Sequence, residues 1–268
     1  MQQFLSTWFN LCTWERVSED GQRFKGLFDQ WINVSPDIWT EQRLDIFERS
    51  CVPSVINQTI QDFTWVVFVD PKTPDRFFAR FTKIQEAVMP IKMVVLPCPA
   101  WHNRGLFSYR KLLAEYISLH ILPKTTRVLT TRLDNDDLLE RDFMKMVQRA
   151  ARAIDLSSVS VRPIVYSWGY FLRVPGNSLR LRKYVRNQFP SVVEGVREGA
   201  MVQTIWAVQH AEVSRLGPVI ALGSEESPGW ITLIHGNKKM TGNAGNVMCG
   251  IQVAWDSDYM KVHFGIAD

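Results

Sequence analysis

Short apolar runs typical of strands alternate with helical stretches through the first half of the chain, and this alternation limits the possible folds most strongly. The strand-like runs lie at 4–9, 64–69, 92–96 and 127–133, and the helical spacing of apolar residues predicts helices at 40–57, 74–87 and 108–121. Strands joined by helices form right-handed crossovers in a parallel sheet. The pattern therefore predicts an α/β class with a Rossmann-like, mostly parallel central sheet and helices on both faces.

The pattern changes after a predicted helix at 139–153. The strand-like runs that follow are separated by irregular links, and they lie at 159–166, 169–174, 201–208 and 230–234. We interpret this part as a mixed-sheet second half that packs on the first half. The prediction is a single domain over 1–268, with its two halves at 1–137 and 138–268.

Charge and hydropathy exclude several classes of protein. The 31 Lys and Arg residues against 27 Asp and Glu residues give a net charge of only +4, and these residues are evenly spread. Nucleic-acid binding proteins concentrate basic residues on one face, so no nucleic-acid partner is expected. The longest apolar stretches, 65–69 and 88–101, are shorter than the roughly 18 residues of a membrane span. The N-terminus lacks the basic region of a signal peptide, so we expect a cytoplasmic protein.

Four cysteines, at Cys12, Cys51, Cys98 and Cys249, are scattered without the spacing of a zinc site or a disulfide framework. Because reduced cysteine behaves as a small apolar residue, we expect buried thiols.

An acidic segment follows the last strand-like run of the first half. Asp134 and Asp136 are two residues apart, so on extended backbone both carboxylates project to one side, where they could bind Mg²⁺ or Mn²⁺. The alternative is a polar turn in which Asp137 caps a helix that begins near Leu138. A calcium EF-hand loop is excluded because Leu139 occupies the position that needs glycine.

Four pieces of sequence in chain order resemble one known family. They are 43–59; 65–75; Asn103-Arg104-Gly105 with Arg110-Lys111; and Arg132-Leu133-Asp134-Asn135-Asp136-Asp137 together with 230–236 and Asn237. The set resembles the nucleotide-sugar glycosyltransferases of the GT-A fold, of the inverting family-2 type, and more narrowly the putative rhamnosyltransferases. The resemblance covers about Phe4 to Asn243.

The resemblance implies a GT-A-type fold, with a nucleotide-binding half at 1–137 and an acceptor-side half at 138–268. It implies a metal-dependent glycosyltransferase that moves a sugar such as rhamnose from a nucleoside-diphosphate sugar to a glycan or similar hydroxyl acceptor, with inversion.

Site residues follow from the same resemblance. Asp70 would contact the base or ribose, Arg110 the phosphates, and Asp134 the ribose or sugar. Asp136 and His235 would bind the cofactor, Mn²⁺ or Mg²⁺, at the diphosphate. The strand-like run before His235 would deliver it to the sheet edge where Asp134 lies, because ligands gather at the carboxyl ends of strands.

Inversion requires a general base for the acceptor hydroxyl. Glu225 and Glu226 are the candidates, with Glu212 and Asp137 as rivals, and the sequence does not choose among them.

Two other functions remain open. A catalytically inactive, carbohydrate-binding relative would use some of the ten tryptophans as stacking platforms. A phosphoryl-transfer enzyme of the haloacid-dehalogenase kind also uses D-x-D after a strand. Its motif should lie near the N-terminus and be followed by Thr or Val, whereas here it lies in the middle of the chain and Asp137 and Leu138 follow.

Overall fold

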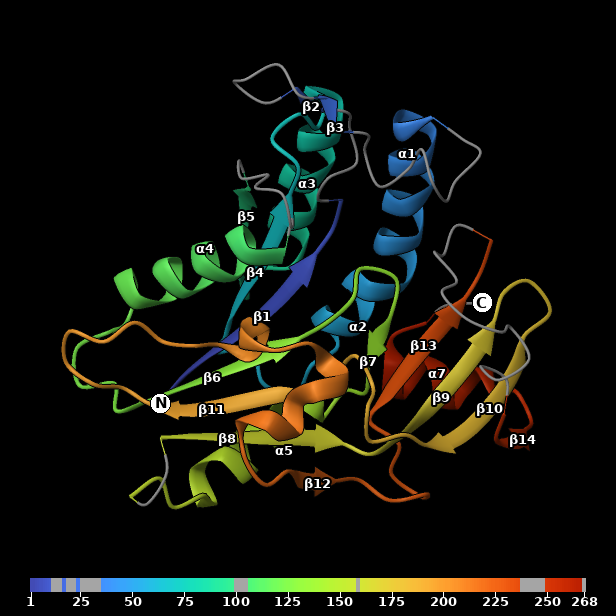
Figure 1. Ribbon diagram of the computed structural model, residues 1–268. Helices are drawn as coiled ribbons and strands as arrows, with labels where there is room; N and C mark the ends of the chain where they lie inside the picture. Colours follow the sequence, from blue (N-terminus) through green and yellow to red (C-terminus); the bar gives the residue numbers. More distant parts are fainter. Residues whose placement is uncertain are drawn as a thin grey trace.

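The central feature of the structure, a computed structural model, is a seven-stranded sheet in the order β12-β8-β11-β6-β1-β4-β5 (Figure 1). The structure describes residues 1–10, 16–17, 23–24, 35–98, 106–157, 160–236 and 249–266. The strands of this sheet are β1 (Gln2–Trp8), β4 (Thr64–Val69), β5 (Lys92–Pro97), β6 (Arg127–Arg132), β8 (Val161–Tyr166), β11 (Ser191–Gly195) and β12 (Ile220–Leu222). A separate two-stranded sheet pairs β2 (Arg16–Val17) with β3 (Arg23–Phe24).

Four neighbouring strands, β5, β4, β1 and β6, are parallel. From β5 inward they follow the chain order third, second, first, fourth, so the connections change direction between β1 and β6. In open α/β sheets, ligands bind outside the carboxyl ends of the strands at such a point. Strand β11 runs antiparallel between β6 and β8, and β12 is parallel to β8. The predicted α/β class with a mostly parallel sheet is confirmed.

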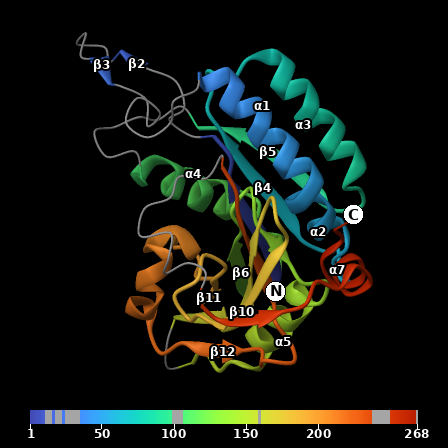
Figure 2. The same cartoon turned by 90° about the vertical axis from the view of Figure 1, so that its right-hand side faces the viewer.

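Helices cover both faces of the central sheet (Figure 2). The helices are α1 (Pro36–Ile46), η2 (Phe47–Cys51), α2 (Val52–Ile56), α3 (Asp75–Ala87), α4 (Leu106–Leu119), α5 (Phe143–Ala153), η3 (Ile205–Ala207) and η4 (His210–Leu216). Residues of α1, η2, α2, α3 and α5 pack on one face of the sheet. Residues of α4, η3 and η4 pack on the other.

Helix α1 and the following segment η2 are joined to α3 by ion pairs, most of them made by one arginine. Arg80 of α3 makes a bidentate pair with Glu48, at 2.9 and 2.8 Å, and also contacts Glu41 and Asp45 at 2.6 and 2.8 Å. These acids recur at helical spacing and form one stripe, whereas Arg43 lies on the buried side of the same helix. The clamp therefore holds α1 with Arg43 turned toward the interior.

The second sheet has the order β14-β10-β9-β13-β7 and packs against α7. Its elements are β7 (Leu138–Leu139), β9 (Trp168–Arg173), β10 (Ser178–Lys183), β13 (Trp230–Ile234), β14 (Ile251–Val253) and α7 (Ser257–Phe264). The sheet is mixed, because β13 is parallel to β9 and antiparallel to β7. The mixed character predicted for the second half is confirmed.

Two predicted elements are wrong. The strand expected at 201–208 is instead irregular backbone leading into η3, because the Thr204 side chain accepts a hydrogen bond from Trp206 N and Thr130 of β6 accepts one from Ile205 N. The helix expected at 139–153 begins only at Phe143, because Leu139 pairs with Trp230 in the second sheet.

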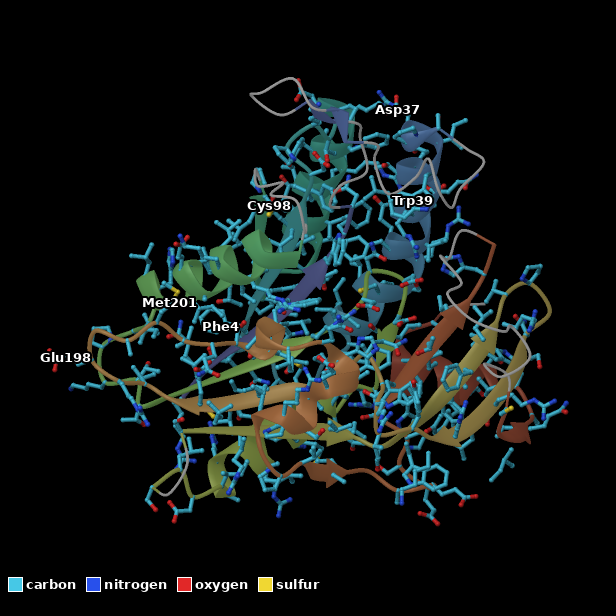
Figure 3. The ribbon with its side chains drawn as sticks, viewed as in Figure 1. Phe4, Asp37, Trp39, Cys98, Glu198 and Met201 are labelled. Carbon is cyan, nitrogen blue, oxygen red and sulfur yellow. The ribbon has the colours of Figure 1, made fainter. Side chains whose placement is uncertain are left out.

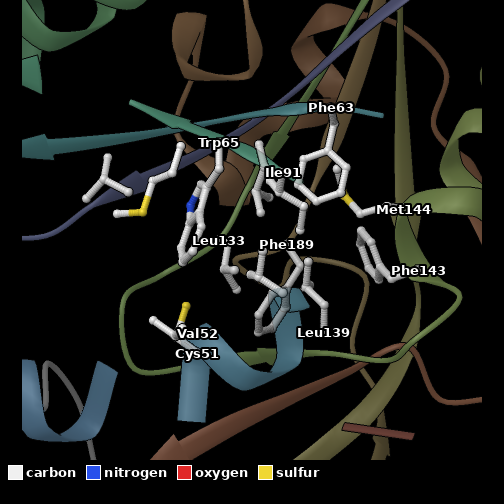
Figure 4. Packing of buried hydrophobic residues seen from close by; sticks show 14 of the residues in the cluster. Cys51, Val52, Phe63, Trp65, Ile91, Leu133, Leu139, Phe143, Met144 and Phe189 are labelled. Carbon is white, nitrogen blue, oxygen red and sulfur yellow. The ribbon is translucent and has the colours of Figure 1, made fainter. Parts of the chain in front are cut away.

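The largest apolar core lies between the central sheet and the segment that runs from η2 to α2 (Figure 4). Cys51 of this segment packs there with Trp65 of β4, and Leu133 and Leu139 belong to the same cluster. Leu133 and Leu139 flank the acidic segment and both have no exposed surface. The acidic segment is therefore a short loop anchored in the core at both ends.

Burial of the cysteines agrees with the prediction at two positions. Cys51 and Cys98 are free and buried, whereas Cys249 is exposed, so the prediction is wrong there. Cys12 lies outside the described residues. Within the ranges that the structure covers, no helix is both long and apolar enough to cross a bilayer.

Gly169 of β9 tests how tightly Trp230 of the neighbouring strand β13 is packed. Trp230 stacks on Phe189 and meets Phe171 edge-on, and a Cβ at Gly169 would lie 2.1 Å from its indole ring. We predict that Gly169→Ala lowers the free energy of unfolding by about 3 kcal/mol in urea denaturation, because the core would be overpacked. Gly195→Ala is the control, since nothing lies within 4 Å of its Cβ position. Equal effects of the two substitutions would show that the packing around Trp230 is loose.

Candidate active site

The acidic loop after β6 is a turn and not extended backbone. Leu133 N donates to Ser6 O of β1 at 3.0 Å, and Asp137 N donates to Asp134 O at 3.3 Å. The argument that alternation places both carboxylates of the motif on one side therefore fails. Asp134 and Asp136 instead bind different arginines.

Asp137 is fully buried and joins the loop to the second sheet. Its Oδ1 accepts from Leu233 N at 3.0 Å, and its Oδ2 accepts from Gln188 Nε2 at 2.7 Å. The prediction that Asp137 caps a helix is wrong, because α5 begins at Phe143 with Asp142 at its N-cap. The contacts give Asp137 a structural role.

Asp136 lies in a buried group formed by three distant parts of the chain. Arg43 Nη1 of α1 lies 2.6 Å from Asp136 Oδ2, and His235 Nε2, directly after β13, lies 3.0 Å from the same oxygen. The three side chains are 7%, 5% and 8% exposed. The expected proximity of His235 to the acidic motif is observed across 99 residues of sequence. The strand that delivers it belongs to the second sheet and not to the central one.

Asp134 belongs to a second, more open group. Arg132 donates from Nε and Nη2 to Asp134 Oδ1 at 3.1 and 3.0 Å, and its guanidinium lies 4.4 Å from the centre of the Trp206 ring. Arg132 Nη1 also approaches His210 Nδ1 at 3.1 Å. Burial, together with the charge of Arg132, lowers the pKa of His210, so a neutral imidazole accepts this hydrogen bond.

Asp70 lies at the carboxyl end of β4 and is fully buried. Its Oδ1 accepts from Lys72 N at 2.9 Å, and its own backbone N–H donates to Asn10 Oδ1 at 2.9 Å. Asn10 Nδ2 in turn donates to Thr73 Oγ1 at 3.0 Å. The polar residues after β1 and β4 thus form one network beside the acidic loop. The predicted contact of Asp70 with a nucleotide stays a prediction.

Of the other residues predicted for the site, those that the structure describes do not join the groups around Asp136 and Asp70. Arg110 of α4 donates to Ala207 O at 3.3 Å, next to the segment that carries His210. Glu225 and Glu226 follow β12, the edge strand, which β11 and β8 separate from β6. Ser224 lowers the pKa of the exposed Glu226. Glu212 pairs with Arg215 on η4 at 2.9 Å. Residues Asn103-Arg104-Gly105 and Asn237 lie outside the described residues.

The donor atoms of the buried group fit a divalent cation in chemistry. Carboxylate oxygen and imidazole nitrogen are both ligands of Mn²⁺, and such ions are commonly held by one or two side chains together with substrate phosphates. Asp136 and His235 already contact one cationic group, because Arg43 Nη1 lies within 3.4 Å of both side chains. The described residues contain no cluster of three or more His, Cys, Asp or Glu side chains that could hold a metal. Asp136 and His235, which the sequence also predicts, remain the two candidate ligands.

Sequence reasoning missed Arg43, Arg132, His210 and Asn10 as site residues. Arg43 stands within a helical pattern, where arginine usually faces solvent, and His210 lies in a segment without regular periodicity. The usable signal was Asn10, because a polar residue that directly follows a buried strand of a parallel sheet lies at the ligand-binding edge.

The tryptophans offer little support for a carbohydrate-stacking surface. Trp39, Trp65, Trp206 and Trp230 are buried. Trp8, Trp168 and Trp255 are only partly exposed, and the other three lie outside the described residues.

A surface groove of about 660 Å³ lies between α4 and residues 196–201. Val196 N bonds to Thr126 O, so the groove lies at the amino end of β6, opposite the acidic loop. In Figure 3, Glu198 and Met201 lie on the opposite side of the molecule from Trp39 of α1.

Comparison with known proteins identifies a family. The family model described as "Putative rhamnosyl transferase" matches residues 33–245, which is most of the chain. A search of curated proteins finds no match.

Among solved structures, the chain is similar to S. aureus TarS, with a TM-score of 0.42, 8% identity, and 87% of this chain and 37% of that chain covered. A structure of S. aureus TarS 1-349 in complex with UDP gives a TM-score of 0.38 and 11% identity, with 87% of this chain and 61% of that chain covered. A structure described as a putative glucose-1-phosphate thymidylyltransferase from Bacillus anthracis in complex with a sucrose gives a TM-score of 0.33 and 8% identity, with 85% of this chain and 88% of that chain covered. The chain spans less than two thirds of the length of these TarS chains.

Asp137→Asn tests whether this carboxylate is structural. The substitution would turn an amide N–H₂ group toward either Leu233 N or Gln188 Nε2, both of which are donors. We predict a loss of about 2 kcal/mol in the free energy of unfolding, measured with urea. Asp134→Asn is the matched control. Because the ion pair of Asp134 with Arg132 is partly exposed, its loss should change the free energy of unfolding by less than about 1 kcal/mol. The assignment fails if the control is the less stable variant.

His210 makes stability depend on pH. Its pKa is lowered in the folded protein, so below about pH 6.5 the unfolded chain binds more protons and stability falls as pH falls. In urea titrations between pH 7.5 and 5, we predict that wild type loses up to about 1.4 kcal/mol per pH unit more than His210→Gln. Parallel pH profiles of the two proteins would contradict this assignment.

Proposed function

The chain belongs to the putative rhamnosyl transferase family, and we propose that it transfers a sugar from a nucleoside-diphosphate sugar to a hydroxyl group of a glycan or similar acceptor. Membership places the chain among the glycosyltransferases. The observation that carries the proposal is the position of the acidic loop, directly after β6 and beside β1, where the strand order reverses. Ligands of open α/β sheets bind at this point.

The donor would lie along the carboxyl ends of β4, β1 and β6. The network around Asp70 and Asn10 would position the nucleoside, and Asp134 would contact the ribose or the sugar. Arg132, held between Asp134 and Trp206, would supply positive charge near the phosphates, with Arg110 beside the same segment. A guanidinium is suited to this task because its planar donors match phosphate oxygens.

Asp136 and His235 would hold a divalent cation, Mn²⁺ or Mg²⁺. When bound, the cation would stabilise the charge that develops on the leaving diphosphate. The buried position of both side chains supports this role, because electrostatic stabilisation is stronger where water is excluded.

Transfer with inversion would need a general base on the acceptor side. Glu225 and Glu226 remain the candidates for this role. They lie on the link between β12 and β13, at the amino end of β13, whereas His235 follows its carboxyl end.

The proposal is tested by incubating the protein with Mn²⁺, a panel of nucleoside-diphosphate sugars and a mixture of glycan acceptors, and measuring nucleotide release. We predict release from one class of donor, and a loss of at least about tenfold in Asp134→Asn, which corresponds to about 1.4 kcal/mol in the activation free energy. Glu198→Gln, at the opposite side of the molecule, is the control and should keep the wild-type rate.

Two results would contradict the proposal. Binding of nucleoside diphosphate without any transfer would indicate the inactive, sugar-binding relative. Equal rates in wild type and Asp134→Asn would show that the acidic loop is not the donor site.

A further inference from the structure

We propose that Arg43 and a divalent cation are alternative partners of Asp136 and His235, so that the chain carries a competitor for its own metal. The inference rests on the proposed function, because it concerns the metal of that same site. It adds a role for Arg43, a residue that neither the sequence motifs nor the family match assigns.

Arg43, Asp136 and His235 meet in one small space. Arg43 Nη1 lies 2.6 Å from Asp136 Oδ2 and 3.4 Å from His235 Nε2, and Asp136 Oδ2 and His235 Nε2 are 3.0 Å apart. An ion bound to both atoms would stand about 2.1 Å from each of them. The guanidinium reaches the same small space, so the ion and Nη1 cannot both remain there.

The charge of Arg43 also opposes a divalent ion at this position. The three side chains are at most 8% exposed, so water screens little of the repulsion between a guanidinium and a divalent ion. Arginine stays protonated in proteins and cannot lose its charge to make room. Entry of the metal therefore requires the guanidinium to move away from Asp136.

The structure also supplies a second contact for the guanidinium. Trp39 lies one helical turn before Arg43, and the guanidinium carbon is 5.0 Å from the centre of its ring. A cation over an aromatic face is stabilised without a carboxylate. In addition, Arg43 lies in the last turn of α1, next to the π-helical segment η2, and such segments occur frequently at functional sites.

With competition, the apparent affinity for metal equals the intrinsic affinity multiplied by the fraction of molecules in which Asp136 is free of Arg43. If Arg43 occupies Asp136 in nine molecules of ten, removal of its charge should tighten metal binding about tenfold. Removal of another arginine near the loop should not have this effect.

The experiment is a Mn²⁺ titration, followed by electron paramagnetic resonance, of protein without nucleotide. We predict that Arg43→Gln binds Mn²⁺ at least about tenfold more tightly than wild type. Arg132→Gln is the matched control, because it also removes one guanidinium charge, but from the arginine that pairs with Asp134. The Mn²⁺ affinity of this variant should stay within about threefold of wild type. Equal affinities of wild type and Arg43→Gln would overturn the proposal, as would equal gains in both variants.

A second measurement covers the case in which Arg43→Gln folds poorly, since Asp136 would become an unpaired buried charge. Mn²⁺ should then raise the melting temperature of Arg43→Gln toward that of wild type, because the ion replaces the missing cation. The double variant Arg43→Gln with Asp136→Asn should lose this response. If Arg43→Gln stays unstable at every Mn²⁺ concentration, the competition does not exist.

These readouts contain no nucleotide, sugar or acceptor. If nucleotide sugars are not turned over while Arg43→Gln gains Mn²⁺ affinity, the proposed function fails alone. If wild type transfers sugar while Arg43→Gln gains no affinity, the competition fails alone.

Discussion

The buried ion pair between Arg43 and Asp136 connects the parts of the molecule that form the candidate site. Burial of two charges is costly unless their geometry is good, and here the 2.6 Å contact and the nearby imidazole of His235 satisfy the carboxylate oxygen. Arg80 joins α3 to α1 and η2, and β7 pairs with β13, so both partners of the pair lie on elements with further tertiary contacts. The first helix, the acidic loop and the end of β13 are thus positioned by one another.

The two aspartates of the D-x-D motif therefore have different surroundings. Asp134 is paired with Arg132 at the sheet edge and keeps about 29% of its side chain exposed, whereas Asp136 is nearly enclosed. An exposed carboxylate beside a guanidinium suits contact with a substrate. An enclosed carboxylate beside an imidazole suits an ion. Asp137, which follows directly, serves neither purpose and holds the loop to the second sheet. On this burial pattern we base the proposal that each acid of the segment has a separate task.

The sequence was sufficient for the elements whose pattern is unambiguous. Strands β4 and β13 have the predicted bounds, because each is an uninterrupted run of β-branched, aromatic and other apolar residues. The pattern did not reveal β10, in which Leu179 and Leu181 alternate with arginines over six residues, nor the link at 201–204, whose backbone depends on contacts with β6 and β11. For the site, the strand ends predicted that Asp136 and His235 meet. The role of Arg43 could not be predicted, because the side of a helix that becomes buried is decided by tertiary packing.

The account is tested most directly by a crystal structure of the protein with Mn²⁺ and the nucleoside diphosphate of its donor, in which the anomalous signal of manganese locates the ion. We expect one ion bound to Asp136 and His235, with the diphosphate beside the acidic loop and Arg43 no longer in contact with Asp136. A manganese ion elsewhere, or an Arg43–Asp136 pair that persists with the nucleotide bound, would contradict it.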